Sequence, residues 1–588
     1  MRYLALLCAV LPLWASAAVD YQIKITDPDQ HLADIQIKMT AEQAGAFSLK
    51  LPAWRSGKYQ ILDLANGVRR FEARLANGQA VPVEKTEKST WQLQLPAAGD
   101  IVVSYQLYAN ELNQRTRHID DTHAYINASA FLMYHDAQRK DPVTVSLQVP
   151  QGWRSTSGMT RTGDHSFKAA DYDVLADSPI ETGIHQSFTF KADGRDYEVV
   201  FWGQGNFDAA QTVKDLEKIV LQAGSIWQGY PYQNYLFIVH AAASGARGAT
   251  EHLNSTVIQR DRFSFRKREH YLEFLSTAAH ELVHTWNVKA YRPAELVPYD
   301  YLQPNYSKLL WISEGSTSYF QNQLLLRAGL MTPQEFYTDL AKRLKRFERT
   351  PGREIQSVAQ SSFDNWISLG GDHADNFSVN IYSEGYLVSW MLDHFLMNNS
   401  GLKSNYRTLH NELYQRFGKT TAFTAADVQK IAEDLTGKSL ADFWLDQVET
   451  PLELDAETLL TAAGLQLVKP KPTEPFTGLT VQADKTGAEI SKVERDSPAW
   501  LADFSVGDQI IALDGLQLQT ELAERLKDFP ADTAIKVTLF RDGRLLERQL
   551  TPKAQPAGSW QIVPVAKPTR QQKAYYRAWL GVDLPSAK

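Results

Sequence analysis

The spacing of the apolar residues changes twice along the 588-residue chain, and each change marks a region of different structure. Up to about residue 190, apolar and polar residues alternate, which is typical of half-buried antiparallel strands. The clearest alternating runs are residues 21–25, 35–39, 47–51 and 91–95. Because these strands follow one another closely, we expect an N-terminal antiparallel β-sandwich. From about residue 198 to 450 the period becomes helical, and after a proline-rich linker at residues 469–475 short strands return.

Local signals in the central region predict where several helices begin and end. Residues 332–335 and 424–427 have the pattern of capping boxes, and Gly437 is suited to end the second of these helices. Long apolar runs at residues 309–327 and 386–397 indicate buried helices. The central region is therefore expected to form the largest compact unit.

The first 18 residues form a different kind of segment. Arg2 supplies a positive charge, residues 4–13 are apolar, and residues 15–17 form a small-residue cleavage pattern. We interpret residues 1–18 as a signal peptide and expect export across the inner membrane, into the periplasm. The only cysteine, Cys8, lies within this segment. A lipid anchor at Cys8 is an alternative, but little apolar sequence precedes it.

The overall composition is that of a globular protein and excludes some functions. Hydrophobic residues make up 44% of the chain and charged residues 22%. The 61 Lys and Arg against 68 Asp and Glu give a net charge of −7, without blocks of like charge. This balance argues against nucleic-acid binding through counterion release. No later stretch is apolar enough to span a membrane.

His280, Glu281 and His284 form an HExxH sequence within a segment of helical apolar spacing. On a helix, residues four apart project from the same face, so both imidazoles can reach one ion. Two histidines and a carboxylate are the ligands of many catalytic zinc sites. Glu281 adjoins a ligand but points away from the metal, which suits a general base that activates water.

Glu314 is the expected third zinc ligand. It stands alone within an apolar segment that should form a buried helix. Burying an unpaired carboxylate costs several kcal/mol, so this residue needs a cation. An arginine partner is the alternative interpretation. The zinc helix predicted 30 residues upstream favours the metal.

These residues resemble a known family. His280-Glu281-x-x-His284-x-Trp286-Asn287-Val288-Lys289, followed by Trp311-x-x-Glu314-Gly315, is similar to the glycyl aminopeptidase family of PDZ-containing zinc metallopeptidases. That family belongs to the gluzincins, with thermolysin and aminopeptidase N. The resemblance covers nearly the whole exported chain, including residues 120–124. It implies one Zn²⁺ per chain and a thermolysin-like α+β catalytic domain with a mostly helical C-terminal part.

The resemblance also implies substrate-binding and catalytic residues. Residues 248–255 resemble the segment in which an edge strand aligns the substrate, so Gly248 and Ala249 would contact the peptide and Glu251 would bind its free α-amine. Residues 381–387 resemble the segment that supplies an oxyanion-stabilising tyrosine, here Tyr382. A surface charge for Glu251 and a core tyrosine for Tyr382 are the alternatives. The lysine of the family is replaced by Glu384.

The C-terminal strands resemble a PDZ domain, in particular residues 476–479, 496–499 and 507–510. Such a domain would bind peptide C-termini, whereas an ordinary small β-domain is the alternative. The expected domains are a signal peptide 1–18, an N-terminal β-domain 19–190, a catalytic domain 191–330, its helical part 331–460, a PDZ-like domain 461–555 and a C-terminal tail 556–588.

The sequence therefore predicts an exported multidomain zinc aminopeptidase that removes small N-terminal residues such as Gly or Ala from peptides. A zinc endopeptidase that uses the same metal, with the PDZ-like domain recruiting unfolded chains, is one alternative. A catalytically silent peptide-binding scaffold is another.

Overall fold

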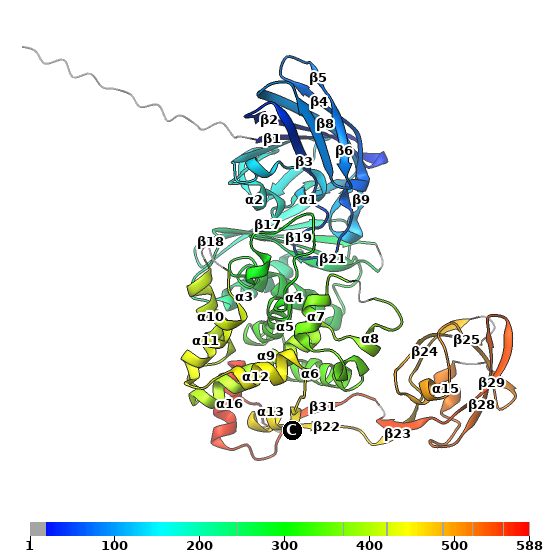
Figure 1. The fold of residues 1–588 in the computed structure, drawn as a ribbon. Coiled ribbons are helices and arrows are strands. Elements are labelled where there is room, and N and C mark those ends of the chain that lie inside the picture. The colour runs from blue at the N-terminus through cyan, green and yellow to red at the C-terminus, as the bar shows by residue number, and fades with distance from the viewer. Residues whose placement is uncertain are drawn as a thin grey trace, which may run out of the picture.

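The computed structural model describes residues 19–243, 245–367, 370–418, 422–484, 487–519, 521–556 and 558–586. A β-rich N-terminal domain stacks on a central catalytic region, and a small C-terminal β-domain stands to one side (Figure 1). The expected signal peptide lies outside the described residues. Among the described helices, none is long and apolar enough for a membrane crossing.

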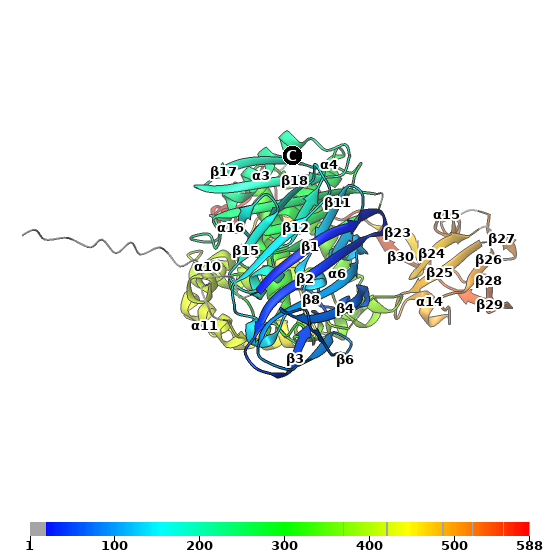
Figure 2. The same ribbon diagram turned by 90° about the horizontal axis from the view of Figure 1, so that it is seen from above.

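The N-terminal domain is built from three sheets. An eight-stranded sheet and the three-stranded sheet β3-β7-β6 share one hydrophobic core, and a five-stranded sheet faces the catalytic region. The eight-stranded sheet has the order β14-β15-β12-β1-β2-β8-β4-β5, and Figure 2 shows it from above. The third sheet has the order β13-β16-β11-β10-β9. The strands are β1 (Val19–Asp27), β2 (Leu32–Ala41), β3 (Gly45–Lys50), β4 (Val68–Leu75), β5 (Ala80–Val81), β6 (Val83–Glu87), β7 (Thr90–Leu95), β8 (Gly99–Tyr108), β9 (Asn110–Glu111), β10 (Arg117–Ile119), β11 (His123–Ile126), β12 (Val143–Gln148), β13 (Arg154–Ser157), β14 (Thr160–Gly163), β15 (Ser166–Ala169) and β16 (Ile180–Gly183).

One pair of strands departs from the expected antiparallel sandwich. β1 pairs with β12 in parallel, whereas its other neighbour β2 is antiparallel. Alternation of apolar residues fixes the face that a strand buries but not the direction of its neighbour. The sheet is therefore mixed.

The catalytic region begins with a five-stranded mixed sheet in the order β17-β18-β19-β21-β20. Its strands are β17 (His185–Ala192), β18 (Arg195–Trp202), β19 (Asn234–Ala242), β20 (Arg247–Glu251) and β21 (Ser255–Asp261). Because β17 pairs with β18 along its length, residues 185–190, which the sequence assigned to the N-terminal β-domain, belong to this sheet. β20 lies at the edge of the sheet.

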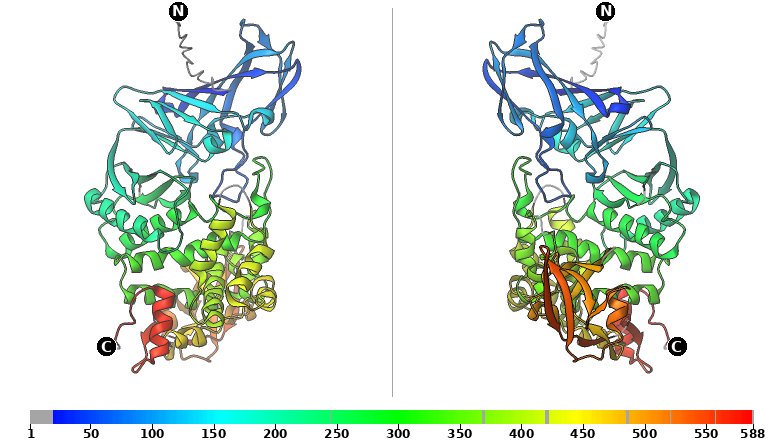
Figure 3. Two further views of the ribbon diagram at one scale, coloured as in Figure 1. Left: turned by 90° about the vertical axis from the view of Figure 1, so that its left-hand side faces the viewer. Right: turned by 90° about the vertical axis from the view of Figure 1, so that its right-hand side faces the viewer.

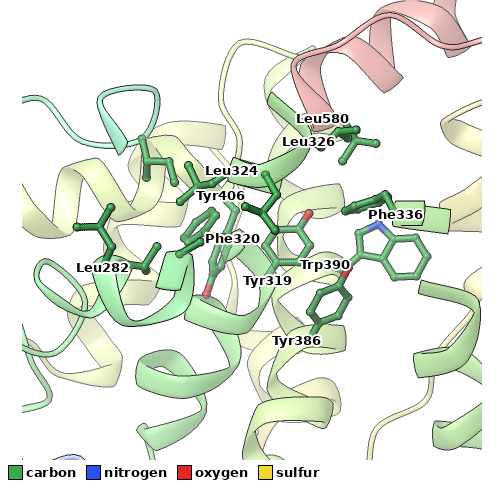
Figure 4. Close-up of a cluster of buried hydrophobic side chains, with 14 of the residues drawn as sticks. Leu282, Tyr319, Phe320, Leu324, Leu326, Phe336, Tyr386, Trp390, Tyr406 and Leu580 are labelled. Atoms are coloured by element: carbon green, nitrogen blue, oxygen red, sulfur yellow. The ribbon is translucent and has the colours of Figure 1, made fainter. Parts of the chain in front are cut away.

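Helices make up the rest of the catalytic region. They include α3 (Ala209–Ala223), α4 (Arg268–His284), α5 (Leu310–Arg327), α6 (Pro333–Glu348), α7 (Val358–Asp364), α8 (Ala374–Phe377), α9 (Ile381–Ser400), α10 (Tyr406–Phe417), α11 (Ala425–Thr436), α12 (Ala441–Trp444) and α13 (Ala456–Ala462). The predicted capping boxes begin α6 and α11, and Gly437 ends α11 in a left-handed conformation, as predicted. Aromatic and leucine side chains from α5, α6 and α9 fill the core between these helices (Figure 4).

Helices α5 and α9 approach each other very closely at Gly315 and Gly385. A Cβ atom added to Gly315 would lie 2.4 Å from the backbone of Gly385. No larger residue fits at this crossing. The contact fixes the position of Glu314, which precedes Gly315, and of the first turn of α9, which carries Tyr382.

The C-terminal β-domain contains β24 (Leu479–Asp484), β25 (Gly487–Val493), β26 (Gln509–Leu513), β27 (Leu516–Gln517), β28 (Ile535–Arg541) and β29 (Arg544–Leu550), with the short helices α14 (Pro498–Leu501) and α15 (Leu522–Leu526). The expected proline-rich linker contains a strand, β23 (Pro472–Phe476), which pairs with β30 (Lys553–Pro556). A second pair, β22 (Leu465–Val468) and β31 (Gln561–Pro564), lies on the catalytic region. The chain therefore leaves and re-enters the catalytic region through paired strands.

The chain ends in α16 (Arg570–Leu580), which packs against the catalytic helices (Figure 3). The Trp579 indole N–H donates to the Tyr319 hydroxyl at 2.7 Å, and the Tyr337 and Tyr576 hydroxyls are hydrogen-bonded at 2.7 Å. The tail beyond the C-terminal β-domain is thus part of the core of the catalytic region.

A buried carboxylate joins the N-terminal domain to the catalytic sheet. Glu181 in β16 accepts hydrogen bonds from His123 at 2.8 Å and from His240 in β19 at 2.9 Å, and all three side chains are fully buried. Burial opposes ionisation, but the two histidines lower the pKa of Glu181 to about 2. His123 therefore has a structural role, as a buried partner of Glu181.

Candidate zinc site

Helix α4 directs both histidines of the HExxH sequence to one point. The Nε2 atoms of His280 and His284 are 3.0 Å apart. The Nδ1 atom of His280 faces Gln321 Oε1 at 2.8 Å, and that of His284 faces the Asn287 carbonyl at 3.0 Å. Because both oxygens are acceptors, each Nδ1 carries the proton and each Nε2 presents a lone pair. Two lone pairs at this distance need a cation between them.

Glu314 in α5 completes the arrangement. Its Oε2 atom lies 3.3 Å from His284 Nε2 and 3.7 Å from His280 Nε2. Tetrahedral zinc with bonds of about 2.1 Å separates its ligand atoms by about 3.4 Å. Among the described residues, no arginine or lysine forms an ion pair with Glu314, so the geometry favours a metal over the alternative of an arginine partner. The three side chains fit zinc.

Asn287 holds the two zinc helices together. Its amide donates to the carbonyls of Ile312 and Ser313 at 2.7 and 3.1 Å, and to the Thr317 hydroxyl at 3.0 Å. The backbone carbonyl of Asn287 accepts from His284 Nδ1 and so orients this imidazole. The residue therefore fixes the spacing between α4 and α5.

The two remaining carboxylates of the site lie together beside His284. Single ligand atoms of Glu251, Glu281 and His284 are all within 4.8 Å of one another. Both carboxylates are buried, with 4% and 6% of Glu251 and Glu281 exposed. Burial and the neighbouring Glu251 and Glu314 carboxylates, opposed by His284, raise the pKa of Glu281 above its ordinary value. Glu251 is therefore a buried residue of the site, and not the surface charge of the alternative interpretation.

Tyr382, in the first turn of α9, lies over the zinc ligands. Its ring centroid is 6.0 Å from that of His280, and the residue as a whole is 37% exposed. The hydroxyl end is enclosed, and burial together with the charges of Glu314, Glu251 and Glu281 raises the pKa of Tyr382 well above its ordinary value. Tyr382 is thus not part of the hydrophobic core.

Glu384, two residues after Tyr382 in the first turn of α9, is buried. Burial raises the pKa of its carboxyl to about 8, against the lowering effect of Arg353. Its Oε1 atom has no hydrogen-bond partner among the described residues. Burial without a hydrogen-bond partner at Oε1 therefore disfavours the charged form of this carboxyl.

The sequence did not indicate that the N-terminal domain reaches into the site. The loop of residues 52–60 extends from β3 toward α4 and α5. Its Tyr59 hydroxyl donates to Glu314 Oε1 at 2.8 Å, and its Gly57 lies so close to Glu251 that an added Cβ would be 2.4 Å from the carboxylate. Tyr59 thereby orients a zinc ligand, and Gly57 forms a wall beside Glu251.

A buried polar network holds this loop in place. Asp177 accepts from the Ser56 hydroxyl at 3.0 Å and from Lys289 Nζ at 2.9 Å, and it is hydrogen-bonded to His252 Nδ1 at 3.1 Å. His252 directly follows Glu251, and Ser56 directly precedes Gly57. The network therefore fixes both sides of the contact between Gly57 and Glu251.

Two family models match the chain. Residues 20–184 match the Peptidase M61 N-terminal domain, and residues 273–388 match the M61 glycyl aminopeptidase. The second match spans both zinc helices and Tyr382. No curated protein matches the sequence.

A solved structure shares the architecture. An aminopeptidase N family protein from Idiomarina loihiensis is 28% identical, covers 96% of this chain and 100% of its own, and superposes with a TM-score of 0.88. An M1 zinc metallopeptidase from Deinococcus radiodurans is a far more distant match, with 15% identity, coverage of 71% of this chain and 90% of its own, and a TM-score of 0.45.

The family matches and the geometry of the site define the class of this protein. It is a zinc metallopeptidase of the aminopeptidase type. Two of its segments match domains of the M61 glycyl aminopeptidases.

Proposed function

We propose that this protein is an exported aminopeptidase in which His280, His284 and Glu314 hold one zinc ion per chain. It releases N-terminal residues from peptides, with a preference for small residues such as Gly and Ala. Export is supported by the signal-peptide pattern of residues 1–18, and the preference by the resemblance to the glycyl aminopeptidases.

Each remaining residue of the site has a separate task. Zinc, when bound, supplies a Lewis acid that polarises the scissile carbonyl and activates water. Glu281 accepts a proton from the attacking water and returns it to the leaving amine. Tyr382 donates its hydroxyl proton in a hydrogen bond to the oxygen that becomes negative. Glu251 pairs with the protonated α-amine of the substrate.

The contact between Gly57 and Glu251 carries the assignment as an aminopeptidase. An endopeptidase needs an open groove on both sides of the scissile bond. Here the loop of residues 52–60 closes the site behind the carboxylate that would bind the amine. A substrate residue preceding that amine would meet this loop. The geometry therefore favours an exopeptidase over an endopeptidase.

We propose a peptide-binding role for the C-terminal β-domain, on the basis of its resemblance to PDZ domains. β24 lies at the edge of its sheet, where an extended peptide C-terminus could pair with it. The turn at Thr477–Gly478 directly precedes that strand.

The metal dependence of the activity tests this function against the silent scaffold. We expect about one tightly bound zinc per chain by elemental analysis, and loss of peptidase activity on exhaustive chelation followed by recovery with added zinc. Inactive protein that retains its zinc would instead support a scaffold. Full activity without detectable metal would contradict the zinc mechanism itself.

A further inference from the structure

Three positively charged side chains of the N-terminal domain lie near one another, and two of them, both arginines, interact with the charges of the site's carboxylates. They are Arg55 and Lys58 in the loop of residues 52–60, and Arg115, which follows β9. Arg55 is 1% exposed and Arg115 is half-buried. Among the described residues, no carboxylate forms an ion pair with any of the three, although the charges of Glu251 and Glu281 act on both arginines.

The guanidinium groups have only neutral partners. Arg55 donates to the carbonyls of Gln114 and Ser56, both at 3.1 Å, and its Nη2 atom is buried without a hydrogen-bond partner. Arg115 donates to the Thr250 hydroxyl and the Asn113 carbonyl, both at 3.2 Å. Burying a cation without a counter-charge is costly. These groups are therefore suited to an anion that arrives with the substrate.

The position of Arg115 along β20 indicates which substrate group it meets. A Cβ atom added to Gly248 would lie 2.2 Å from Arg115 Nη1, so the guanidinium covers the backbone three residues before Glu251. A peptide whose amine is held at Glu251 can follow β20 only by running antiparallel to it, toward Gly248. At about 3.3 Å per residue, three residues span about 10 Å.

We infer that Arg115, supported by Arg55, binds the C-terminal carboxylate of short peptides, so that the enzyme favours di- and tripeptides. A tripeptide bound along β20 would place its carboxylate beside Arg115, whereas longer chains would carry a neutral peptide group past it. Arg115 is thus a specificity residue at the end of β20 opposite to Glu251. The inference rests on the proposed aminopeptidase function.

A matched pair of substrates tests this inference. Tri-alanine with a free C-terminus should have a kcat/KM about tenfold or more above that of tri-alanine amide, because the free acid makes a charge-assisted hydrogen bond that the amide cannot make. The Arg115→Gln variant should reduce this ratio toward one, and Arg115→Lys should retain part of it. The preference for the free acid over the amide should also decline for alanine peptides of five or six residues.

A neighbouring arginine provides the control. Arg247 begins β20, is exposed and pairs with Glu273 at 3.4 Å. The Arg247→Gln variant removes the same charge from the residue next to Gly248. It should preserve the ratio of kcat/KM between tri-alanine and tri-alanine amide. If Arg115→Gln and Arg247→Gln lowered the ratio of free acid to amide equally, the cause would be a general charge effect. That result would contradict the inference.

Two further outcomes separate failure of this inference from failure of the proposed function. Equal rates for free acid and amide, with a free amine still required, would overturn the carboxylate site but keep the aminopeptidase. An Arg115-dependent preference for Glu-Ala-Ala amide over tri-alanine amide would assign the cations to an acidic first side chain and also overturn the inference. Cleavage of neither tripeptide, when zinc is bound, would contradict the aminopeptidase itself.

Discussion

Replacing Glu281 by glutamine should lower kcat by roughly 10²–10⁴-fold while bound zinc is retained. The glutamine amide keeps the shape of the side chain but cannot accept the proton of the attacking water. Glu281 points toward Glu251 and His284, and it is not one of the three side chains whose atoms match a tetrahedral site. Elemental analysis and single-turnover rates on the same preparation would measure both effects.

The matched control for Glu281→Gln is Glu314→Ala. This variant removes a side chain that faces both Nε2 atoms, so the metal itself should be lost. The two variants would then be inactive for different reasons. Comparable metal content and turnover in both would contradict the separate roles of these residues.

Replacing Tyr382 by phenylalanine should lower kcat by about 10²–10³-fold with little change in KM. The ring remains over His280, but the hydroxyl that stabilises the developing negative charge is lost. Zinc content should not change, since Tyr382 lies outside the ligand set. Steady-state kinetics over a range of substrate concentrations would separate kcat from KM.

Tyr59→Phe is the control for Tyr382→Phe. It removes another phenol of the same site, whose hydroxyl donates to Glu314 Oε1 at 2.8 Å. We expect zinc affinity to fall roughly 10–100-fold, because a hydrogen bond that orients a metal ligand is lost. If Tyr382→Phe also lost zinc, its proposed role in stabilising the oxyanion would be wrong.

The zinc site could be predicted from the sequence because its determinants are local. His280 and His284 lie one turn apart on a helix, and Glu314 is a lone acidic residue in an apolar helical segment. Such spacing can be interpreted from the sequence alone, before the fold is known. The close contact of Gly315 with Gly385 then explains the glycines that follow Glu314 and Glu384 in the segments of residues 311–315 and 381–387.

The rest of the site could not be predicted because it comes from a distant part of the chain. Tyr59, Gly57 and Arg115 precede the zinc helix by more than 150 residues and belong to no recognisable motif. Their roles depend on how the N-terminal domain docks, which the network around Asp177 and the buried Glu181 determine.

Two strand pairings that the sequence did not indicate have a related cause. β17 alternates like the strands before it, and alternation does not tell which sheet a strand joins. The prolines of β23 indicated a linker, but a two-stranded ribbon has free edges that do not need every backbone N–H. In both cases strand pairing over long sequence distances determined the outcome.

The central claim, that this zinc enzyme is an aminopeptidase, depends most directly on the charge of the substrate's N-terminus. A buried carboxylate such as Glu251 should pair with a protonated amine, and the wall at Gly57 leaves little room behind it. Acetylation removes the charge and adds bulk at this place. In the Glu251→Ala variant the advantage of the free amine should shrink, with zinc content unchanged.

The decisive measurement is kcat/KM for one peptide in its free and N-acetylated forms on the unmodified enzyme. The free peptide should be cleaved at least about tenfold faster, as expected for a charge-assisted contact. Equal rates for the two forms would contradict the aminopeptidase and identify the protein as an endopeptidase.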